Sequence, residues 1–430
     1  MNNQQGNITM IWKASLVAAL LLFALPSCQK EDRDHNGLIF WSSNNTEEIN
    51  FTKKYVDAWN QEHTDLPVAF QIVPEGQSSE EVILAAVVGR TTPDIYANMW
   101  QGDVEDFALS GVLVPLDTLD GFLDFLYERC DSQVVKEITS SDGHIYQIPW
   151  KVNPIMMEYN PSLFKKEGMD SIPGHYTDFL AAGAKLKSSN TYLGISEVNA
   201  IWWQRFFNFL PLYYAASGGA PLVKDGKAAF DNEYGVMVFD FLQKIYIPEY
   251  FPKESLKGQR DPFLAQKVAT TFTGPWTFDF NEKFKPAGLK YDFREVPVPD
   301  DHVGPIYTYG DPKNIVIFNT CQHPENAWRF LKTLLSEKAD LDFLEMSRQF
   351  PRRKNLMDNP SFASYFKVHP ELVPFARQTE HLRGIDCEPY MKEVLDLISQ
   401  EYEACVVYGL KPPAQGIKDA AHAVDLLYLR

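Results

Sequence analysis

The chain has 430 residues, of which 45% are hydrophobic and 23% are charged. This length exceeds the size at which a single hydrophobic core keeps growing, so the sequence predicts two lobes. The balance of residue types is that of a folded protein and excludes a disordered or fibrous chain. The formal net charge of −17 disfavours nucleic acid and anionic membrane surfaces as partners, because both attract basic patches.

The amino terminus has the features of an export signal. Residues 14–25 are uncharged and mostly apolar, and they follow Lys13. They are too few to cross a bilayer as a helix, which disfavours an uncleaved anchor and favours a secretory signal peptide. The sequence L-P-S-C that ends at Cys28 resembles the lipobox of bacterial lipoproteins, in which the cysteine is acylated and the chain is cut before it.

From these features we predict a signal peptide at residues 1–27, lipidation at Cys28, and a polar tether over residues 28–37. The start of translation is either Met1 or Met10. The protein is then an exported lipoprotein, anchored in a membrane through Cys28, that faces the periplasm or the cell exterior.

Four cysteines remain in the mature chain: Cys130, Cys321, Cys387 and Cys405. Export permits disulfides, and four cysteines allow three pairings. The pattern over residues 389–404 predicts a helix that would hold Cys387 and Cys405 about 25 Å apart, which is beyond disulfide reach. The other pairings and free thiols stay open.

The first third of the mature chain alternates strand and helix. The predicted strands are 38–41, 68–73 and 94–97, and the predicted helices are 46–60, 79–88 and 103–110. Such alternation implies right-handed crossovers and a parallel sheet. Gly89 and Gly111 follow the second and third helices, where we expect left-handed caps.

The expected strand ends carry aromatic and small polar side chains. Trp41 and Ser42 follow the first strand, and Asn98 and Trp100 follow the third. Ligands bind beyond the carboxyl ends of the strands in such sheets, and these ends share one edge. This edge therefore suits a ligand that is stacked on one face and hydrogen-bonded at its rim.

The rest of the chain is predicted in less detail. Residues 160–297 are helical and aromatic, with the densest cluster of rings at 201–207. An extended connector is expected over 291–300, a strand over 314–318 and a helix over 324–335.

Four groups of residues, spread along the mature chain, carry a resemblance. They are PDI at 93–95 with GVLVPLD at 111–117; QIPW at 147–150 with MEYN at 157–160 and LFKKEG at 163–168; FLAQKVA at 263–269 with GPW at 274–276; and VPVP at 296–299 with NAWRFL at 326–331. In their order and spacing, the chain resembles the family 1 extracellular solute-binding proteins of ABC importers, the group that includes maltose-binding protein.

The resemblance implies an α/β periplasmic-binding-protein fold, with two lobes, a hinge of three crossovers and an interlobe cleft that closes on its ligand. Crossovers are expected near residues 150–153, near 296–299, and after the helix that ends at about Leu335. The implied lobes are residues 38–150 with 298–337, and residues 151–297 with 338–430.

The candidate ligand-binding residues come from three arguments. The strand-end argument gives Trp41, Ser42, Asn98, Trp100 and Asp103. The resemblance gives Trp276, in GPW, as a stacking ring, together with Trp150 and Asn153 at the first crossover, and Tyr309, Asp311 and Arg348. Of the neighbours Trp202 and Trp203 at most one can face a ligand, and we select Trp203. The alternative for the rings is core packing, and for Arg348 a solvated surface charge.

Enzyme signatures are absent from the sequence. It has no G-x-S-x-G, H-E-x-x-H or P-loop motif, and its nine histidines lack metal-ligand spacing. We therefore predict a monomeric binding protein, without cofactor or metal, that captures a small solute, a sugar or oligosaccharide, for an ABC permease. Two alternatives stay open: a surface glycan-binding or sensing lipoprotein without a permease, and a secreted glycoside hydrolase, which would need two carboxylates in the cleft.

Overall fold

The computed structural model describes residues 37–74, 79–195, 202–256 and 261–429, without the side chains of residues 202–207. From Leu38 onward these residues belong to one compact unit. No helix in these ranges is long and apolar enough to span a membrane. The predicted signal peptide and the lipidation site at Cys28 lie outside the described residues.

The larger sheet has six strands in the order β13-β4-β12-β3-β1-β2. Its strands are β1 (Leu38–Ser42), β2 (Val68–Ile72), β3 (Ile95–Trp100), β4 (Ile148–Val152), β12 (Lys313–Ile317) and β13 (Phe350–Pro351). Strand β1 is parallel to β2 and β3, as predicted, whereas β12 is antiparallel to its neighbours β3 and β4.

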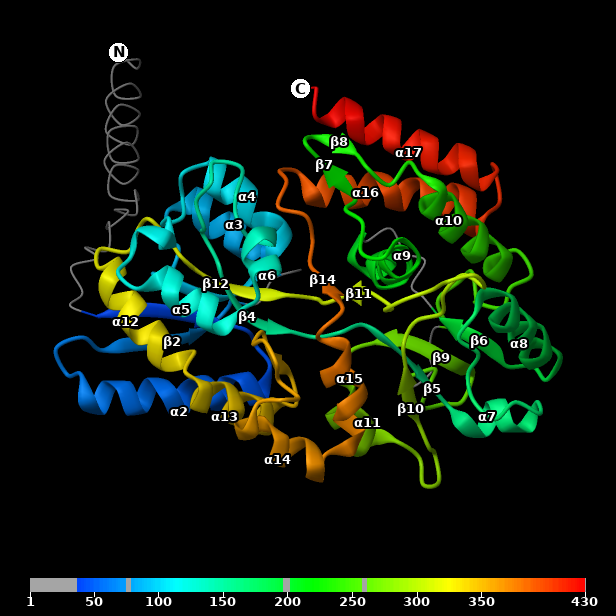
Figure 1. The fold of residues 1–430 in the computed structure, drawn as a ribbon, viewed down its shortest axis with the longest axis horizontal. Coiled ribbons are helices and arrows are strands. Elements are labelled where there is room, and N and C mark those ends of the chain that lie inside the picture. Colours follow the sequence, from blue (N-terminus) through cyan, green and yellow to red (C-terminus); the bar gives the residue numbers. More distant parts are fainter. Residues whose placement is uncertain (1–36, 75–78, 196–201, 257–260, 430) are drawn as a thin grey trace, which may run out of the picture. The chain divides into compact units, whose positions relative to one another are not determined.

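In the described ranges, eight helical segments belong to the same half of the molecule as this sheet. They are α2 (Thr46–Glu62), α3 (Ser79–Gly89), α4 (Gln101–Leu109), η1 (Leu116–Thr118), α5 (Phe122–Arg129), α6 (Ser132–Glu137), α12 (Pro324–Leu334) and α13 (Glu337–Ser347). In Figure 1, α2, α12 and α13 lie side by side.

Helix α2 shows how the sequence builds this half. The Asn45 side chain accepts hydrogen bonds from two backbone N–H groups of the first turn, a cap that stabilises a helix by about 1 kcal/mol. Aromatic residues at helical spacing then form its buried face. Phe51 meets Phe343 of α13 at 5.1 Å between ring centroids, and Trp59 meets Phe330 of α12 at 5.5 Å.

Two local predictions are corrected. Residues 98–100, expected in a loop, continue strand β3, because β12 pairs with Met99 and Trp100. At the end of α3 the left-handed conformation is taken by Arg90, with φ 55°, and not by Gly89, whereas Gly111 after α4 has φ 68°.

The smaller sheet has four strands in the order β10-β5-β9-β6. Its strands are β5 (Met156–Tyr159), β6 (Tyr192–Ile195), β9 (Val268–Thr273) and β10 (Asp292–Arg294). The other elements of this half are α7 (Pro161–Lys166), α8 (Tyr176–Ser188), α9 (Trp202–Ser217), the hairpin β7 (Val223–Lys224) and β8 (Lys227–Ala228), α10 (Glu233–Tyr246), α11 (Thr277–Phe284), α16 (Met391–Glu401), the π-helix η3 (Tyr402–Val407) and α17 (Pro413–Leu427). Leu, Val, Tyr and Phe side chains make up most of its core.

Between the two sheets, three chain segments lie side by side. They are the link from β4 to β5, strand β11 (Thr308–Tyr309), and strand β14 (Leu382–Arg383), which is parallel to β11. Backbone hydrogen bonds join them: Asn153 donates to Gly310 at 2.6 Å, and Gly310 donates to Arg383 at 2.9 Å. Figure 1 shows β11 and β14 between the two sheets.

The second and third crossings come later in the chain than the positions near Val296 and after Leu335. Val298 and Tyr309 pack in the core of the smaller sheet, so the chain stays on that sheet as far as β11. Helix α13 packs on α2, and β13 pairs with β4, so the chain leaves the larger sheet after Pro351. It then forms α14 (Pro360–Val368), η2 (Pro370–Leu372) and α15 (Val373–Gln378) before β14. The lobe boundaries remain a prediction.

The four cysteines are free thiols, and Cys130, Cys321 and Cys405 are buried. Helix α16 continues directly into η3, which agrees with the expectation that a continuous helical segment separates Cys387 from Cys405.

Candidate functional site

The predicted strand-end residues of β1 and β3 lie at one sheet edge. Trp41 is half-buried, and its Nε1 donates to Gln71 Oε1 at 2.8 Å. Asn98 is also half-buried, and its Nδ2 lies 3.5 Å from Ser79 Oγ at the start of α3. Ser42 is fully buried and directs its hydroxyl to a carbonyl of β3. Trp41 and Asn98 therefore keep surface that a ligand can reach, whereas Ser42 serves the sheet.

Trp100 joins the two halves of the molecule. It ends β3 of the larger sheet, but its ring is buried in the core of the smaller one. Its Nε1 donates to Tyr309 Oη at 3.2 Å. The ring also covers Gly102, where a Cβ would lie 2.2 Å from it, so only glycine leaves the necessary room. Trp100 and Tyr309, both predicted site residues, thus meet in a buried contact.

A charged cluster, defined here as Glu80, Asp103, Lys313 and Lys392, lies beside this contact. Lys392 Nζ is 3.1 Å from Asp103 Oδ1, and Lys313 Nζ is 3.5 Å from Glu80 Oε1. Burial raises the pKa of Asp103 to about 6, although Lys392 and Lys313 oppose the change. Burial favours the neutral Lys313 amine, but Asp311 and Glu80 hold the pKa of Lys313 above its ordinary value. Two cations therefore stand beside a carboxylate that changes charge near pH 6.

The segment from β14 to α16 contacts α4 next to this cluster. Gln101 Nε2 donates to the Ile385 carbonyl at 2.7 Å, and the Tyr390 N–H donates to the Asp106 carboxylate at 3.2 Å. Together with the pair between Lys392 and Asp103, these contacts connect α4 to the segment that follows β14. We call the region along these contacts the seam.

The sequence could have indicated part of the charged cluster. Glu80 follows β2 at the same sheet edge as Trp41 and Asn98, but it also stands in the first turn of α3, where an acidic residue suits the helix dipole. Lys313 comes from a strand that runs antiparallel to β3, and Lys392 comes from the other half of the molecule. Nothing in the local pattern pointed to either lysine.

The crossover candidates lie in the interior. Trp150 is 1% exposed and packs on Phe343 at 5.1 Å between ring centroids. Asn153 is 2% exposed, and its Nδ2 donates to Gln349 Oε1 at 3.0 Å. Gln349 in turn donates to Glu48 Oε1 at 2.7 Å. In this structure Trp150 is a core residue, and Asn153 belongs to a buried polar network.

The charges of that network are Glu48 and Lys151, which form a buried ion pair. Burial opposes the ionisation of Glu48, but Lys151, together with hydrogen bonds from Ser43 and Gln349, holds the pKa of Glu48 below its ordinary value. The network links the first turns of α2 to β4 and to the end of α13. The network therefore holds α2, β4 and the end of α13 together next to the crossing segments.

Trp276 lies at the start of α11, and Arg348 reaches this helix from the end of α13. Trp276 is 36% exposed and precedes the first residue of that helix. Its ring covers Gly274, where a Cβ would lie 2.1 Å from it. Arg348 caps α13 with φ 55° and places Nη1 3.5 Å from Asp279 Oδ1 of α11. The side chain of Trp203 lies outside the described residues.

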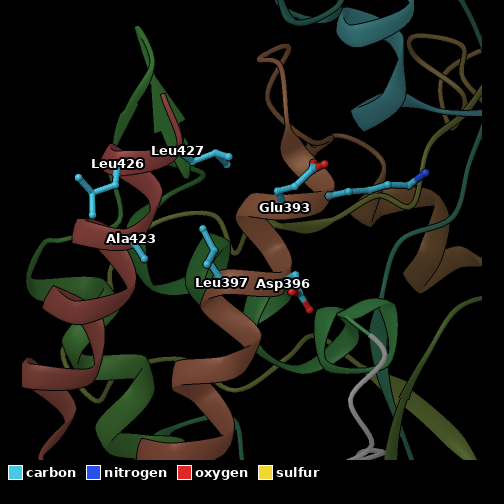
Figure 2. Close-up of a pocket in the computed structure, with 7 residues that line it drawn as sticks. Glu393, Asp396, Leu397, Ala423, Leu426 and Leu427 are labelled. Atoms are coloured by element: carbon cyan, nitrogen blue, oxygen red, sulfur yellow. The ribbon is translucent and has the colours of Figure 1, made fainter. Parts of the chain in front are cut away.

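A groove of about 520 Å³ lies between α16 and α17 (Figure 2). Leu397, Ala423, Leu426 and Leu427 form its apolar lining, with Glu393 and Asp396 among its polar residues. Its lining contains none of the candidate residues predicted from the sequence. Lys392 of the charged cluster also lines the groove, so the groove adjoins the seam at that residue.

The family comparison decides what kind of protein this is. The family model described as Bacterial extracellular solute-binding protein matches residues 43–340, more than half of the chain. The chain belongs to this family. The members of this family are binding proteins and not enzymes. The prediction of a binding protein is therefore confirmed. A small-molecule ligand, a permease partner and a location outside the cytoplasm follow from the same assignment.

Individual relatives support the fold over nearly the whole length of the solute-binding protein. A binding protein of Brucella abortus is 22% identical over 97% of this chain and 98% of its own. An uncharacterized protein of Listeria monocytogenes has a TM-score of 0.80 at 27% identity, covering 91% of this chain and 99% of that one. The sugar-binding protein MalE of Xanthomonas citri has a TM-score of 0.76 at 18% identity, with 91% and 97% covered. The predicted two-lobe fold is thereby confirmed.

Proposed function

We propose that this protein captures a sugar or oligosaccharide at the seam and delivers it to an ABC permease. The observation that carries the proposal is the residue content of the seam and the adjoining sheet edge. Trp41 presents a half-buried ring, while Asp103 and Lys392 supply an acceptor and a donor. Sugar recognition needs flat rings for the C–H face and charged or planar polar groups for the hydroxyls.

Three further observations support this ligand class. MalE of Xanthomonas citri is described as sugar-binding, and a protein of Arthrobacter globiformis, with a TM-score of 0.78 at 19% identity and with 91% and 98% of the two chains covered, as binding cyclic alpha-maltosyl-1,6-maltose. Trp276 offers a second partly exposed ring, at the start of α11. The pairs at the seam join the two halves, so a ligand that replaces them would bind both halves at once.

We further propose that the mature protein is a monomer held at a membrane through a lipid on Cys28. The lipobox-like L-P-S-C sequence supports acylation, and the polar residues after it support a tether. Labelling with a palmitate analogue tests this part, because Cys28→Ser should abolish the label and Cys387→Ser should not.

A thermal-unfolding screen tests the sugar proposal. The purified protein is heated with a panel of mono-, di- and oligosaccharides, and with amino acids and a peptide as non-sugar controls. One sugar should stabilise it by about 2.7 kcal/mol at a hundredfold excess over Kd. Stabilisation by an amino acid or the peptide, with none by any sugar, would refute the ligand class. Incubation should release no new product, and cleavage would support a hydrolase.

The variant Trp276→Ala separates binding from folding. It should weaken the stabilising sugar about tenfold and leave the unfolding midpoint of the free protein unchanged. Tyr408→Ala is the matched control, since Tyr408 is also an exposed aromatic residue, 49% exposed, after η3. Loss of folding in Trp276→Ala would show that the ring is structural.

A further inference from the structure

Helix α11 exposes three aromatic rings along one face. Trp276, Phe280 and Phe284 are 36%, 45% and 53% exposed. They are four residues apart, the spacing that places side chains above one another on a helix. Trp276 itself has helical dihedral angles, φ −59° and ψ −17°, so it continues the row. We call these three residues the aromatic row.

The opposite face of α11 explains the fold of this helix without the aromatic row. Phe278 is 2% exposed and packs against Phe293 at 4.9 Å between ring centroids. Asn281 is also buried and bonds to Glu158 of β5. These contacts already hold α11 on the smaller sheet. Single exposed apolar residues are normal on a protein surface, but a contiguous row of large rings marks a binding surface.

The two outer rings of the aromatic row contact each other. The centroids of Phe280 and Phe284 are 5.0 Å apart, and Lys283 Nζ lies 5.1 Å from the Phe284 centroid. Each step along the row advances about 6 Å at 1.5 Å per residue, which is comparable with the length of one sugar unit in a glycan. Exposed Lys283 lies beside the rings and offers a donor for hydroxyl groups.

We infer that the aromatic row is an extension of the sugar site. Successive units of a bound oligosaccharide stack on its rings as the oligosaccharide extends away from Trp276. The inference rests on the proposed function and deepens it, because it makes the ligand a glycan of several units. Three features favour a glycan over a protein partner. The row begins at Trp276, all its members are aromatic, and their exposed fraction rises from Trp276 to Phe284.

Calorimetric titration with oligomers of increasing length tests the inference. The probes are α-1,4-linked and β-1,4-linked glucose oligomers of two to seven units, titrated into the intact protein. In the unaltered protein, affinity for one series should rise with length. Phe280→Ala and Phe284→Ala should each lower the affinity for the longest oligomer about three- to tenfold and leave that for the two-unit oligomer unchanged.

The outcomes separate the two proposals. If the two-unit oligomer binds but added length gives no gain, or if both phenylalanine variants bind the longest oligomer as the unaltered protein does, the extension is refuted and sugar capture stands. If the folded protein binds no oligomer of either series, the extension is refuted, and the thermal-unfolding screen decides separately whether sugar capture stands. Tyr408→Ala is the control for loss of an exposed ring, and unchanged unfolding midpoints exclude a folding defect.

Discussion

Replacing Glu158 with glutamine should change how the free energy of unfolding depends on pH. Glu158 lies on β5, is 2% exposed, and accepts a hydrogen bond from Asn281 of α11. Burial, with a smaller contribution from Asp261, raises its pKa from 4.5 to about 8, although the bond from Asn281 opposes the change. The folded protein therefore holds this carboxyl group neutral at pH 7.

The sign follows from the raised pKa of Glu158. Below pH 4.5 both states are protonated, and the stability contributed by burying a neutral group is fully present. As the pH rises towards 8, the unfolded chain releases a proton that the folded chain keeps, so the free energy of unfolding falls by about 1.4 kcal/mol per pH unit. Over the whole interval the loss reaches about 5 kcal/mol as an upper limit, and above pH 8 it levels off.

Chemical denaturation at pH values from 4 to 9 measures this loss. Glutamine has nearly the same shape, stays neutral, and keeps the acceptor for Asn281. The variant Glu158→Gln should match the unaltered protein at pH 4.5 and exceed it by a growing margin up to pH 8. Glu345→Gln, at an exposed position of α13, is the control. A difference that stays constant across this range would refute the assignment of a buried neutral carboxyl.

Further variants test the other polar groups. Lys151→Met breaks a buried ion pair and should lower the free energy of unfolding by about 3–5 kcal/mol, whereas Lys244→Met, in an exposed pair, should change it by about 0.5 kcal/mol or less. Asp103→Asn should weaken the stabilising sugar and remove the loss of affinity that we expect as the pH falls through about 6, the raised pKa of Asp103. Gly274→Ala should displace the Trp276 ring, since the added Cβ would lie 2.1 Å from it, and should weaken the sugar as Trp276→Ala does.

Each of these expectations has a clear contradicting result. Equal losses in the two lysine variants would show that the buried pair does not hold the crossing region. A pH-dependent affinity that survives in Asp103→Asn would assign the titration to another group. For Gly274→Ala, the double variant with Trp276→Ala should bind no worse than Trp276→Ala alone; additive losses would mean that the glycine acts by another route.

The sequence predicted the first three strands and their helices because each carries its own pattern. The apolar strands and the amphipathic faces of the helices are local properties, and the parallel order followed from the alternation. The end of β3 was misjudged because Met99 and Trp100 pair with β12, which lies more than two hundred residues later. Pairing partners at such separation leave no trace in a local pattern.

The candidate site was predicted only in part, because some of its residues are brought together by contacts between distant segments of the chain. Trp41, Asn98 and Asp103 follow from the strand-end argument, which needs only the order of elements. Trp150 looked like a ligand contact at a crossover, but α13 supplies Phe343 to cover it. Lys392 comes from the far end of the chain, and its meeting with Asp103 depends on how the two halves pack.

The three crossing segments are joined through main-chain atoms. The bonds from Asn153 to Gly310 and from Gly310 to Arg383 use N–H and carbonyl groups alone, so the bonds themselves do not depend on the side chains of Asn153 and Arg383. Position 310 must stay small, because an added Cβ would lie 2.7 Å from Val152. Ligand preference and hinge geometry can then diverge independently during evolution. A homologue could therefore have a different ligand-binding surface and keep the same hinge.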